Sequence, residues 1–309
     1  MINLLLSRLG ASLLVILGVV TLTFLLLHLV PGDPVEMMLG ESAQAADREA
    51  LRGQLGLDRP LHRQYLDFLT GVATLDPGQS IHTRQPIGEM VWSRLPATLE
   101  LTAAALLIAI AMALPLGVVA AVHRGSLWER LAMGFSLLGI SIPNFWMGPL
   151  LILLFSLGLG WFPVSGREDW TSLVLPALTL GTALAAILSR MVRSTLLDLL
   201  GEGFIRTARA KGLSEYRVIY YHGLRNALLP LITLLGLQLG ALLGGAVITE
   251  TIFSWPGIGL LIIESIQRRD YPVVQVCVIL VSCSYVLINL ITEMLYAWAD
   301  PRIRRGGGV

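Results

Sequence analysis

Long apolar stretches dominate this chain, and shorter polar segments separate them. Six apolar runs occur near residues 9–30, 97–122, 131–157, 172–194, 227–252 and 273–297. A run of about 20 residues forms a helix that is long enough to cross a hydrocarbon layer about 30 Å thick. The runs lack the strict alternation that is typical of strands, and the backbone polar groups of a segment in lipid must be paired internally. We therefore predict an all-α polytopic membrane protein with six transmembrane helices.

The longest polar segment, residues 31–96, separates the first two runs. Asp47-Arg48-Glu49 opens a short helical pattern that stops at Gly56. Asp58-Arg59-Pro60 then resembles a cap with proline in the first turn of a second helix. We expect a small helical subdomain on the extracytoplasmic face, with a plain spacer between spans as the alternative.

An irregular apolar segment, "SWPGIGLLIIESIQRRDYP" at residues 254–272, lies between the last two runs. Its centre is apolar enough to enter the membrane, yet Pro256, Gly257 and Gly259 are expected to break a continuous helix. Irregular backbone persists at membrane depth only where protein or a water-filled cavity shields it. We therefore predict an outer gate at these three residues.

Composition supports a membrane protein and excludes several other classes. Hydrophobic residues make up 55% of the chain, charged residues only 14%, and the mean hydropathy is +0.73. The net charge of +1 gives no indication of nucleic-acid binding. Cys277 and Cys283 lie in one apolar run on different helix faces, so we interpret them as packing residues. The scattered histidines show no ligand spacing, and we expect no metal site in this chain.

The distribution of Lys and Arg predicts the orientation in the membrane. If the N-terminus is cytoplasmic, thirteen of the 22 Lys and Arg residues lie in inside segments. Six of the remaining nine lie in residues 31–96, a long segment in which positive charge has little influence on topology. We therefore predict that both termini are cytoplasmic. The first apolar run exceeds a signal-peptide core, and we interpret it as a retained span.

One inside segment, "RTARAKGLSEYRVIYYHGLRNALLP" at residues 206–230, contains five basic residues, including the chain's only lysine. A helix that runs to Lys211 would end at Gly212, the residue type best suited to a left-handed turn. Ser214 can then cap a second short helix, with Glu215 in its first turn. This arrangement favours a docking element over an ordinary basic loop that only fixes topology.

The same segment resembles the cytoplasmic loop signature of bacterial ABC importer permeases, which reads Glu-Ala-Ala, three residues, Gly, nine residues and Ile-x-Leu-Pro. Placed on Gly212, the signature falls on Arg206-Thr207-Ala208 and on His222-Gly223-Leu224-Arg225, so its acidic first residue and its final proline are absent. This departure is typical of the dipeptide, oligopeptide and nickel importer branch. Stretches with the look and order of that branch span the whole chain, including "HLVPGDP", "RLPATLEL", "ISIPNFW", "FSWPGIG" and "DPRIR".

The resemblance implies a type I ABC importer permease fold in the bacterial inner membrane. A second homologous permease would complete the translocation pore as a heterodimer, with two cytoplasmic ATPase subunits and an extracytoplasmic solute-binding protein. ATP and Mg would be bound by the ATPases, so no cofactor is expected here. The chain also lacks the Gly-x4-Gly-Lys-Ser/Thr phosphate loop, which independently predicts a non-catalytic subunit.

The candidate sites fall into four groups. The expected ATPase-coupling residues are Arg206, Thr207, Ala208, Ala210, Gly212, Leu213, Ser214, Glu215, Tyr216, Arg217, His222 and Arg225. Pro256, Gly257 and Gly259 form the expected outer gate. Glycines at four-residue spacing allow close helix packing, either on the partner permease or within this chain, and these are Gly236, Gly240 and Gly244. The pore candidates are Glu100, Asn144 and Glu250.

Alternatives remain open for the charged residues in or near the spans. An unpaired charge at the bilayer centre is unfavourable, which makes Glu100, Glu250 and Glu293 notable. They can line a pore, pair with Arg190 or Arg193, or lie at the interface. Pro115 in the second run, and Pro143 with Asn144 in the third, predict hinges or static kinks.

The predicted domain organisation follows from these assignments. It comprises an N-terminal transmembrane helix at 1–30, an extracytoplasmic helical segment at 31–96, a core permease domain at 97–300 with the coupling loop at 200–226, and a cytoplasmic tail at 301–309. The expected solute is a short peptide, including di- and oligopeptides and glutathione, with nickel or an opine-type metallophore as the alternative. A self-sufficient secondary transporter or channel would require an inverted repeat, and the two halves show none.

Overall fold

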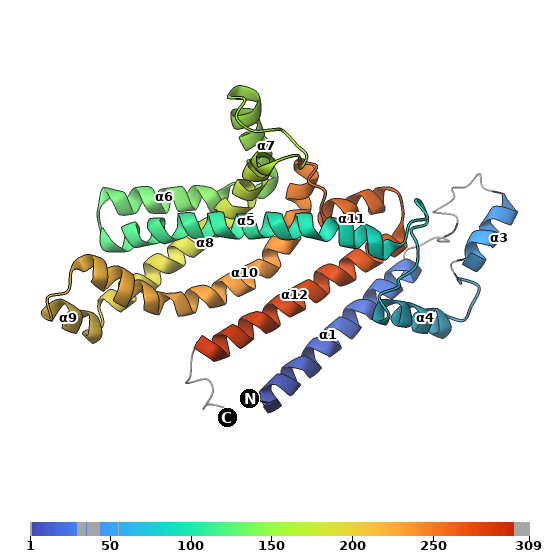
Figure 1. Ribbon diagram of the computed structural model, residues 1–309, viewed down its shortest axis with the longest axis horizontal. Helices are drawn as coiled ribbons and strands as arrows, with labels where there is room; N and C mark the ends of the chain where they lie inside the picture. Colours follow the sequence, from blue (N-terminus) through green and yellow to red (C-terminus); the bar gives the residue numbers. More distant parts are fainter. Residues whose placement is uncertain (1, 30–34, 36–43, 55, 300–309) are drawn as a thin grey trace. The chain divides into compact units, whose positions relative to one another are not determined.

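The computed structural model describes residues 2–29, 35, 44–54 and 56–299 (Figure 1). Its helices are α1 (Ile2–Leu29), α3 (Ala45–Gln54), α4 (Leu61–Ala73), α5 (Ile87–Val122), α6 (Leu127–Ser141), α7 (Asn144–Leu151), α8 (Val174–Leu200), α9 (Gly203–Ala210), α10 (Arg225–Ile252), α11 (Ile258–Gln267) and α12 (Tyr271–Ala299). Two π-helical segments, Ile152–Gly158 and Arg217–Leu224, and a 3-10 turn at Trp170–Leu173 complete them. The prediction of an all-α protein is confirmed for the described residues.

The described helices bear out several predicted spans but not their number. Three are long and apolar enough to cross a membrane, at Ile87–Val122, Trp170–Leu200 and Tyr271–Met294. The number rises to five if each of two bent helix pairs forms one span. In α1 the apolar part within the described residues, Gly10–Leu25, is shorter. Six spans therefore stays a prediction.

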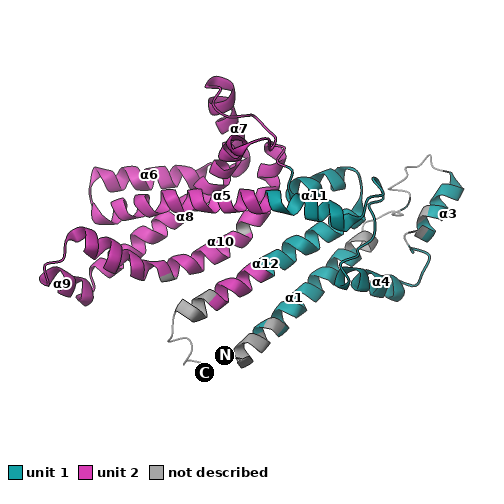
Figure 2. Ribbon diagram, viewed as in Figure 1, with its two compact units in different colours: residues 1–97, 256–286 teal, residues 98–255, 287–309 magenta. Residues whose placement is uncertain are grey.

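The chain divides into two compact units (Figure 2). The first comprises Met1–Ala97 and Pro256–Val286, and the second comprises Thr98–Trp255 and Leu287–Val309.

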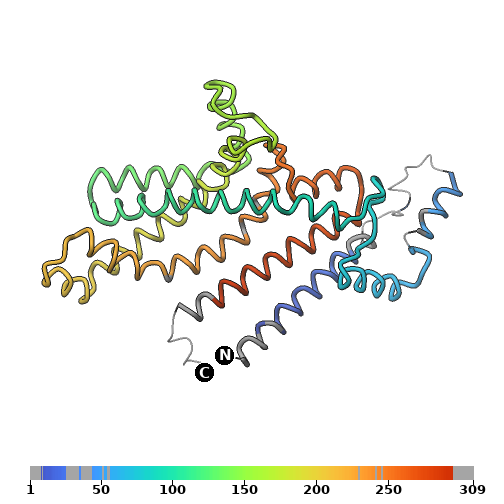
Figure 3. Tube along the Cα trace, viewed as in Figure 1, coloured from blue at the N-terminus to red at the C-terminus, as the bar shows by residue number. Residues whose placement is uncertain are grey.

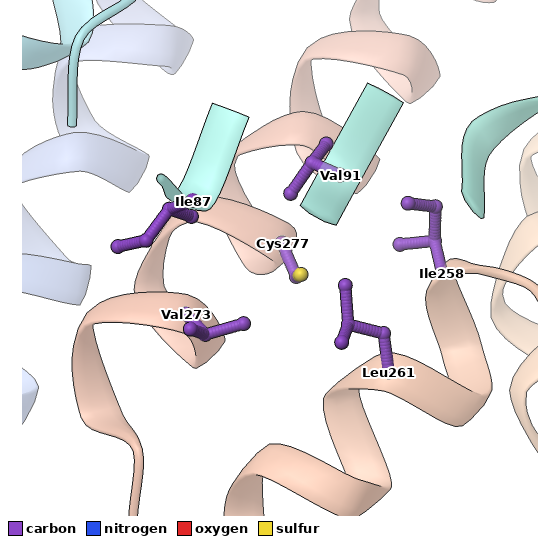
Figure 4. Close-up of a cluster of buried hydrophobic side chains, with 6 residues drawn as sticks. All are labelled: Ile87, Val91, Ile258, Leu261, Val273 and Cys277. Atoms are coloured by element: carbon purple, nitrogen blue, oxygen red, sulfur yellow. The ribbon is translucent and has the colours of Figure 1, made fainter. Parts of the chain in front are cut away.

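The first unit contains a buried apolar cluster that joins α5, α11 and α12. Its members, drawn in Figure 4, are Ile87, Val91, Ile258, Leu261, Val273 and Cys277. Cys277 is a free thiol packed among aliphatic side chains, which confirms its role as a packing residue. The cluster holds the first turns of α5 against α11.

Two helices, α3 and α4, lie in the polar segment that separates the first two apolar runs. Gly56 has a positive φ of 64°, which suits its predicted role after the first of them. Pro60 was expected in the first turn of α4. It is instead the N-cap residue, directly before the helix begins at Leu61. The Tyr65 and Thr21 hydroxyls are 2.8 Å apart and connect α4 to α1. The helical prediction is confirmed here, while the side of the membrane stays a prediction.

The second unit is built around α8, which packs against α6 and α10. Small residues also allow α5 to approach α8, because a Cβ added at Gly117 of α5 would lie 2.6 Å from Val192 of α8. A Cβ at Gly181 of α8 would lie 2.8 Å from the backbone oxygen of Ala105 in α5. Close backbone approach of this kind is the usual role of small residues in membrane helices.

A sharp bend separates α6 from α7, as the Cα trace in Figure 3 shows. The two helices meet at 105°, and the break falls on Ile142 and Pro143. Proline cannot donate a backbone hydrogen bond and restricts the residue before it, which ends α6 here. The interruption predicted at Pro143 and Asn144 is confirmed. Pro115, by contrast, lies within the uninterrupted α5.

Candidate functional site

The segment around Gly212 forms a compact helical turn. Helix α9 ends at Ala210, and Gly212 follows with a φ of 76°, as its left-handed role predicts. The Gly212 N–H donates to the Arg209 oxygen at 2.9 Å, and the Leu213 N–H donates to the Ala208 oxygen at 3.4 Å. This pair of bonds is the Schellman arrangement, in which two otherwise unpaired helix carbonyls are satisfied.

An apolar cluster fixes this turn from inside the chain. Ile205, Ala208 and Val218 are buried together, with Leu200 and Leu213 packed against them. Ala208, one of the expected coupling residues, is therefore buried, and Val218 is buried with it. Both side chains pack between α9 and the helix that follows.

The second helix after Gly212 also differs from the prediction of a short, separate helix. Glu215 and Tyr216 lead into the π-helical segment Arg217–Leu224, which continues directly into α10. Ser214 precedes its first turn, and the Ser214 oxygen accepts a hydrogen bond from the Val218 N–H at 3.0 Å. Only α9 is therefore a separate short helix, and no loop lies between the turn and α10.

An ion pair crosses the turn. Arg209 donates to both carboxylate oxygens of Glu215, at 2.8 and 3.2 Å. The hydrogen bond from Arg209 lowers the pKa of the Glu215 carboxyl, and the same bond raises the pKa of Arg209. Both side chains are largely exposed, so solvent screens the pair and its main effect is to orient the turn.

The exposed face of this segment is aromatic and basic. Tyr216 and Tyr220 stack with ring centroids 4.6 Å apart, and the Arg225 guanidinium lies 5.5 Å from the Tyr221 ring. A shallow hollow of about 510 Å³ is lined by Leu213, Tyr216, Arg217, Tyr220, Tyr221 and His222. Tyr220 and Tyr221 were not among the predicted coupling residues. The spacing of four between Tyr216 and Tyr220 could have indicated that these two share a helix face.

The remaining predicted coupling residues are spread over the surface of the segment. The side chains of Arg206, Thr207 and Ala210 are exposed on α9, and that of Ser214 is exposed in the turn. The structure thus brings the basic and aromatic residues to the surface and buries Ala208 and Val218. We refer to the exposed face, residues 206–225, as the basic–aromatic face.

The expected outer-gate residues lie at and after the end of α10. The helix ends at Ile252, and Gly257 is the N-cap residue of α11 in an extended conformation. Pro256 is half-buried and lies in the break. Gly259 is buried inside α11, so the prediction that it breaks a helix is wrong.

The expected pore residues are mostly engaged within the protein. Glu250 is fully buried and accepts a hydrogen bond from the Thr98 hydroxyl at 2.6 Å. Glu100, one half-turn along α5, pairs with Arg167 at 2.7 Å. Asn144 is half-buried at the start of α7. The alternative pairing with Arg193 is wrong for Glu100 and Glu250, since Arg193 pairs with Glu129 on α6.

The glycines of α10 have different surroundings. A Cβ at Gly236 would overlap the Thr292 side chain of α12, so Gly236 packs within this chain. Gly240 is buried, whereas Gly244 is exposed, and a Cβ added there would meet no atom within 4 Å. The predicted alternatives were packing on the partner permease and packing within this chain, and Gly236 shows the second.

Two family models match the chain. Residues 113–305 match the binding-protein-dependent transport system inner membrane component, and residues 1–102 match the N-terminal part of such membrane components.

Three relatives in other bacteria cover almost the whole chain. It is 46% identical over 334 residues to the di/tripeptide transport system permease protein DppB of Pseudomonas aeruginosa. It is 45% identical over 336 residues to the dipeptide transport system permease protein DppB of Escherichia coli, and 44% identical over 304 residues to the glutathione transport system permease protein GsiC of Salmonella typhimurium. Each comparison covers 98% of this chain and 99% of the relative.

Solved structures show a related fold. An inward-facing MetNI methionine ABC transporter matches with a TM-score of 0.58 and 20% identity, over 68% of this chain and 96% of that one. An amino acid ABC transporter with histidines matches with a TM-score of 0.52 and 18% identity, over 69% of this chain and 94% of that one. At this level of identity the likeness concerns the fold alone.

Proposed function

The chain belongs to the family of binding-protein-dependent transport system inner membrane components, and from this premise we infer that it is the permease subunit of an ATP-driven importer for short peptides. The observation that carries the inference is its match over 98% of its length to permeases named for di- and tripeptide, dipeptide and glutathione transport. The names of these relatives favour peptides over nickel or a metallophore. A self-sufficient transporter or channel is not favoured by this family.

The partners follow from the architecture of ABC importers. The chain works with cytoplasmic ATPase subunits and with a solute-binding protein that delivers the peptide. We propose that a second, distinct permease completes the pore, and that ATP and Mg are held by two ATPase subunits. The protein lies in the bacterial inner membrane, and the distribution of Lys and Arg supports an orientation with both termini in the cytoplasm.

We propose that the basic–aromatic face, residues 206–225, contacts the ATPase. Several observations support this role. The face exposes three tyrosines and several arginines, and both residue types are enriched in protein interfaces. It is also backed by a buried cluster that keeps α9 rigid.

In this proposal, coupling depends on the continuous helix that connects the basic–aromatic face to α10. The π-helical segment Arg217–Leu224 passes into α10 without a loop, so a displacement of the face by the ATPase moves the first turns of α10. The bend of 50° between Arg217–Leu228 and Pro230–Gly244 is the next point at which this motion can be redirected. Proline at position 230 accounts for that bend, because it removes a helix hydrogen bond.

Glutathione is a second candidate solute, because one relative of similar identity is named for its transport. The alignment with the glutathione permease spans 304 residues and covers 98% of this chain, so it is nearly free of gaps. The alignments with the di/tripeptide permease and the dipeptide permease span 334 and 336 residues at the same coverage, so those relatives carry residues that this chain lacks.

Transport by the complete complex tests the proposal. The complex is purified through an affinity tag on this chain, reconstituted in liposomes with its binding protein, and supplied with labelled dialanine, trialanine or glutathione. We expect uptake of at least one peptide that requires both ATP and the binding protein. Uptake that persists without ATP would contradict the importer, and ATP-dependent uptake of nickel with no peptide uptake would contradict the solute class.

A further inference from the structure

A polar pocket of about 250 Å³ lies in the first unit, next to the start of α5. On α5 it is lined by Met90, Ser93 and Arg94, which share one helix face because they are spaced by three and four residues. The adjacent face of the same turns carries Ile87 and Val91, which belong to the buried cluster of Figure 4, and Met90 packs against that cluster. This part of α5 therefore has an apolar side that is anchored and a polar side that is open.

The second wall of the pocket comes from α11 and the turn that follows it. Leu261, Glu264, Ser265 and Arg268 line it at spacings of three, four and seven residues. Leu261 is also a member of the buried cluster, so this wall is anchored to the same apolar core as the first. Two rigid helices thus present side chains of opposite charge to one small space.

One end of the pocket is closed by a fixed carboxylate. Asp270 is 3% exposed, and the Ser80 hydroxyl donates to it at 2.5 Å. The backbone N–H groups of Ile81 and His82 also donate to this carboxylate, at 3.4 and 3.5 Å. Through these hydrogen bonds Asp270 holds the loop before α5 in place. Its carboxylate is therefore already engaged within the protein.

The charged groups of the other walls are available to a ligand. Arg94 and Glu264 are 3.9 Å apart at their nearest nitrogen and oxygen, and each is about one third exposed, at 31% and 34%. Charge-assisted hydrogen bonds are about 2.7–2.9 Å long, so this ion pair leaves both groups with bonding capacity. Arg268 lines the same pocket and its side chain is exposed.

The length of α5 and the polar residues of its first turns favour a position of the pocket outside the hydrocarbon layer. Helix α5 has 36 residues and is about 54 Å long, whereas a hydrocarbon layer is about 30 Å thick. Its first turns carry Glu89, Ser93 and Arg94, which places them outside the hydrocarbon. In the proposed orientation, with the N-terminus in the cytoplasm, this end of α5 faces the outside, from which the peptide arrives.

We propose that this pocket binds the two charged termini of a short peptide, with Arg94 and Arg268 holding the carboxylate and Glu264 holding the ammonium group. The inference rests on the proposed function, since it names a site for the peptide that the importer carries. An extended dipeptide spans at most about 7 Å, which suits a pocket of this volume. Recognition of the termini leaves the peptide's side chains outside the pocket, so one site can accept many sequences.

Binding of dialanine to the detergent-purified permease–ATPase complex, without its binding protein, tests the site. The dissociation constant is measured by saturation-transfer NMR for dialanine, N-acetyl-dialanine and dialanine amide. We expect each blocked peptide to bind about tenfold more weakly than dialanine, because each loses one hydrogen-bonded charge. Equal binding of all three peptides by the wild type would overturn the proposal.

Substitutions assign each terminus to its partner. Glu264→Gln is expected to weaken dialanine binding about tenfold and to abolish the difference between dialanine and N-acetyl-dialanine. Arg94→Gln is expected to abolish the difference between dialanine and its amide instead. The matched controls are Glu89→Gln and Arg63→Gln, which remove the same charges at exposed positions outside the pocket. They should leave all three dissociation constants unchanged.

The outcomes separate this inference from the proposed function. If the wild-type complex imports peptides with ATP but Glu264→Gln and Arg94→Gln behave like the controls, the pocket is not a peptide site and the importer stands. If the wild-type complex imports no peptide at all, the proposed function itself fails.

Discussion

At the scale of single residues, the turn at Gly212 shows how one backbone conformation can position a whole surface. Its φ of 76° lies in the left-handed region, where an L-residue costs about 1–2 kcal/mol. The space around it is open, since an added Cβ would meet no atom within 4 Å. Glycine is therefore required here by the backbone and not by packing.

Gly212→Ala should impair coupling without disturbing the spans. A strain of about 1–2 kcal/mol shifts the conformational equilibrium of the turn by a factor of about 5–30, so peptide-stimulated ATP hydrolysis should fall several-fold. Gly203→Ala is the matched control, because Gly203 also has open space but lies in α9 without a positive φ. The measurements are ATP hydrolysis by the reconstituted complex and the abundance of each subunit. Equal activity of the two variants would show that the left-handed turn is dispensable.

The pH dependence of the ion pair across this turn follows from the lowered pKa of Glu215. A carboxyl whose pKa is depressed by folding contributes its stabilisation above its ordinary pKa of 4.5 and loses it as the pH falls through the folded value. Glu215→Gln should therefore reduce peptide-stimulated ATP hydrolysis by the same fraction at every pH from about 5 to 8. The rates of wild type and variant are compared across this range. A ratio that approaches one as the pH falls across it would contradict the lowered pKa.

At the scale of helices, close approach between elements depends on small residues whose role cannot be told from their spacing alone. Gly236, Gly240 and Gly244 repeat every four residues on α10, yet their surroundings differ. A Cβ added at Gly236 would meet Thr292 of α12, whereas a Cβ added at Gly244 would meet no atom within 4 Å. Gly117 and Gly181 show no such repeat and still mediate the approach of α5 to α8. Helix contacts in this protein are thus set by individual pairs of positions.

Gly236→Ala should destabilise the protein because its new methyl group would overlap Thr292. Overpacking of this kind typically costs about 1–3 kcal/mol. Thr292→Ala removes the Cγ2 and Oγ1 atoms but leaves the Cβ atom 2.6 Å away, so the double variant should recover part of the loss. Gly244→Ala, in open space, should have no such effect. The readout is the thermal denaturation midpoint of the purified complex, and equal midpoints for the two single glycine variants would show that α10 and α12 do not pack at Gly236.

At the scale of the whole molecule, two helices run through both compact units, and the sequence contains no phosphate loop. Helices α5 and α12 each contribute residues to both compact units, so the units are joined by continuous helices as well as by the segment after α10. The chain contains no Gly-x4-Gly-Lys-Ser/Thr sequence, and its only lysine, Lys211, lies in the turn after α9.

The chain purified alone should not hydrolyse ATP. This expectation follows from the missing phosphate loop, whose backbone N–H groups and lysine hold the phosphates in such enzymes. Release of phosphate is measured for the isolated chain, for the complete complex, and for the isolated chain mixed again with the ATPase subunits. Turnover by the isolated chain, in a preparation shown by mass spectrometry to lack ATPase subunits, would contradict a non-catalytic role.

The sequence by itself determined the local features of this protein. Apolar runs predicted helices because a segment in lipid must pair its own backbone groups. The break at Pro143 and the left-handed turn at Gly212 followed from the limits that each residue type places on its own φ or hydrogen bonds. Each of these features depends on a few neighbouring residues, so it could be predicted without knowing what lies across from it.

The tertiary structure decided which side chains are buried and which are exposed. Ala208 was expected to contact a partner and is buried in a cluster with Val218, and Gly259 was expected to break a helix and lies inside α11. The polar pocket unites side chains of α5 and α11 that are about 170 positions apart in the sequence, such as Arg94 and Glu264. Such contacts depend on the rotation and crossing of whole helices, which are set by packing over their full length and not by the pattern of any one segment.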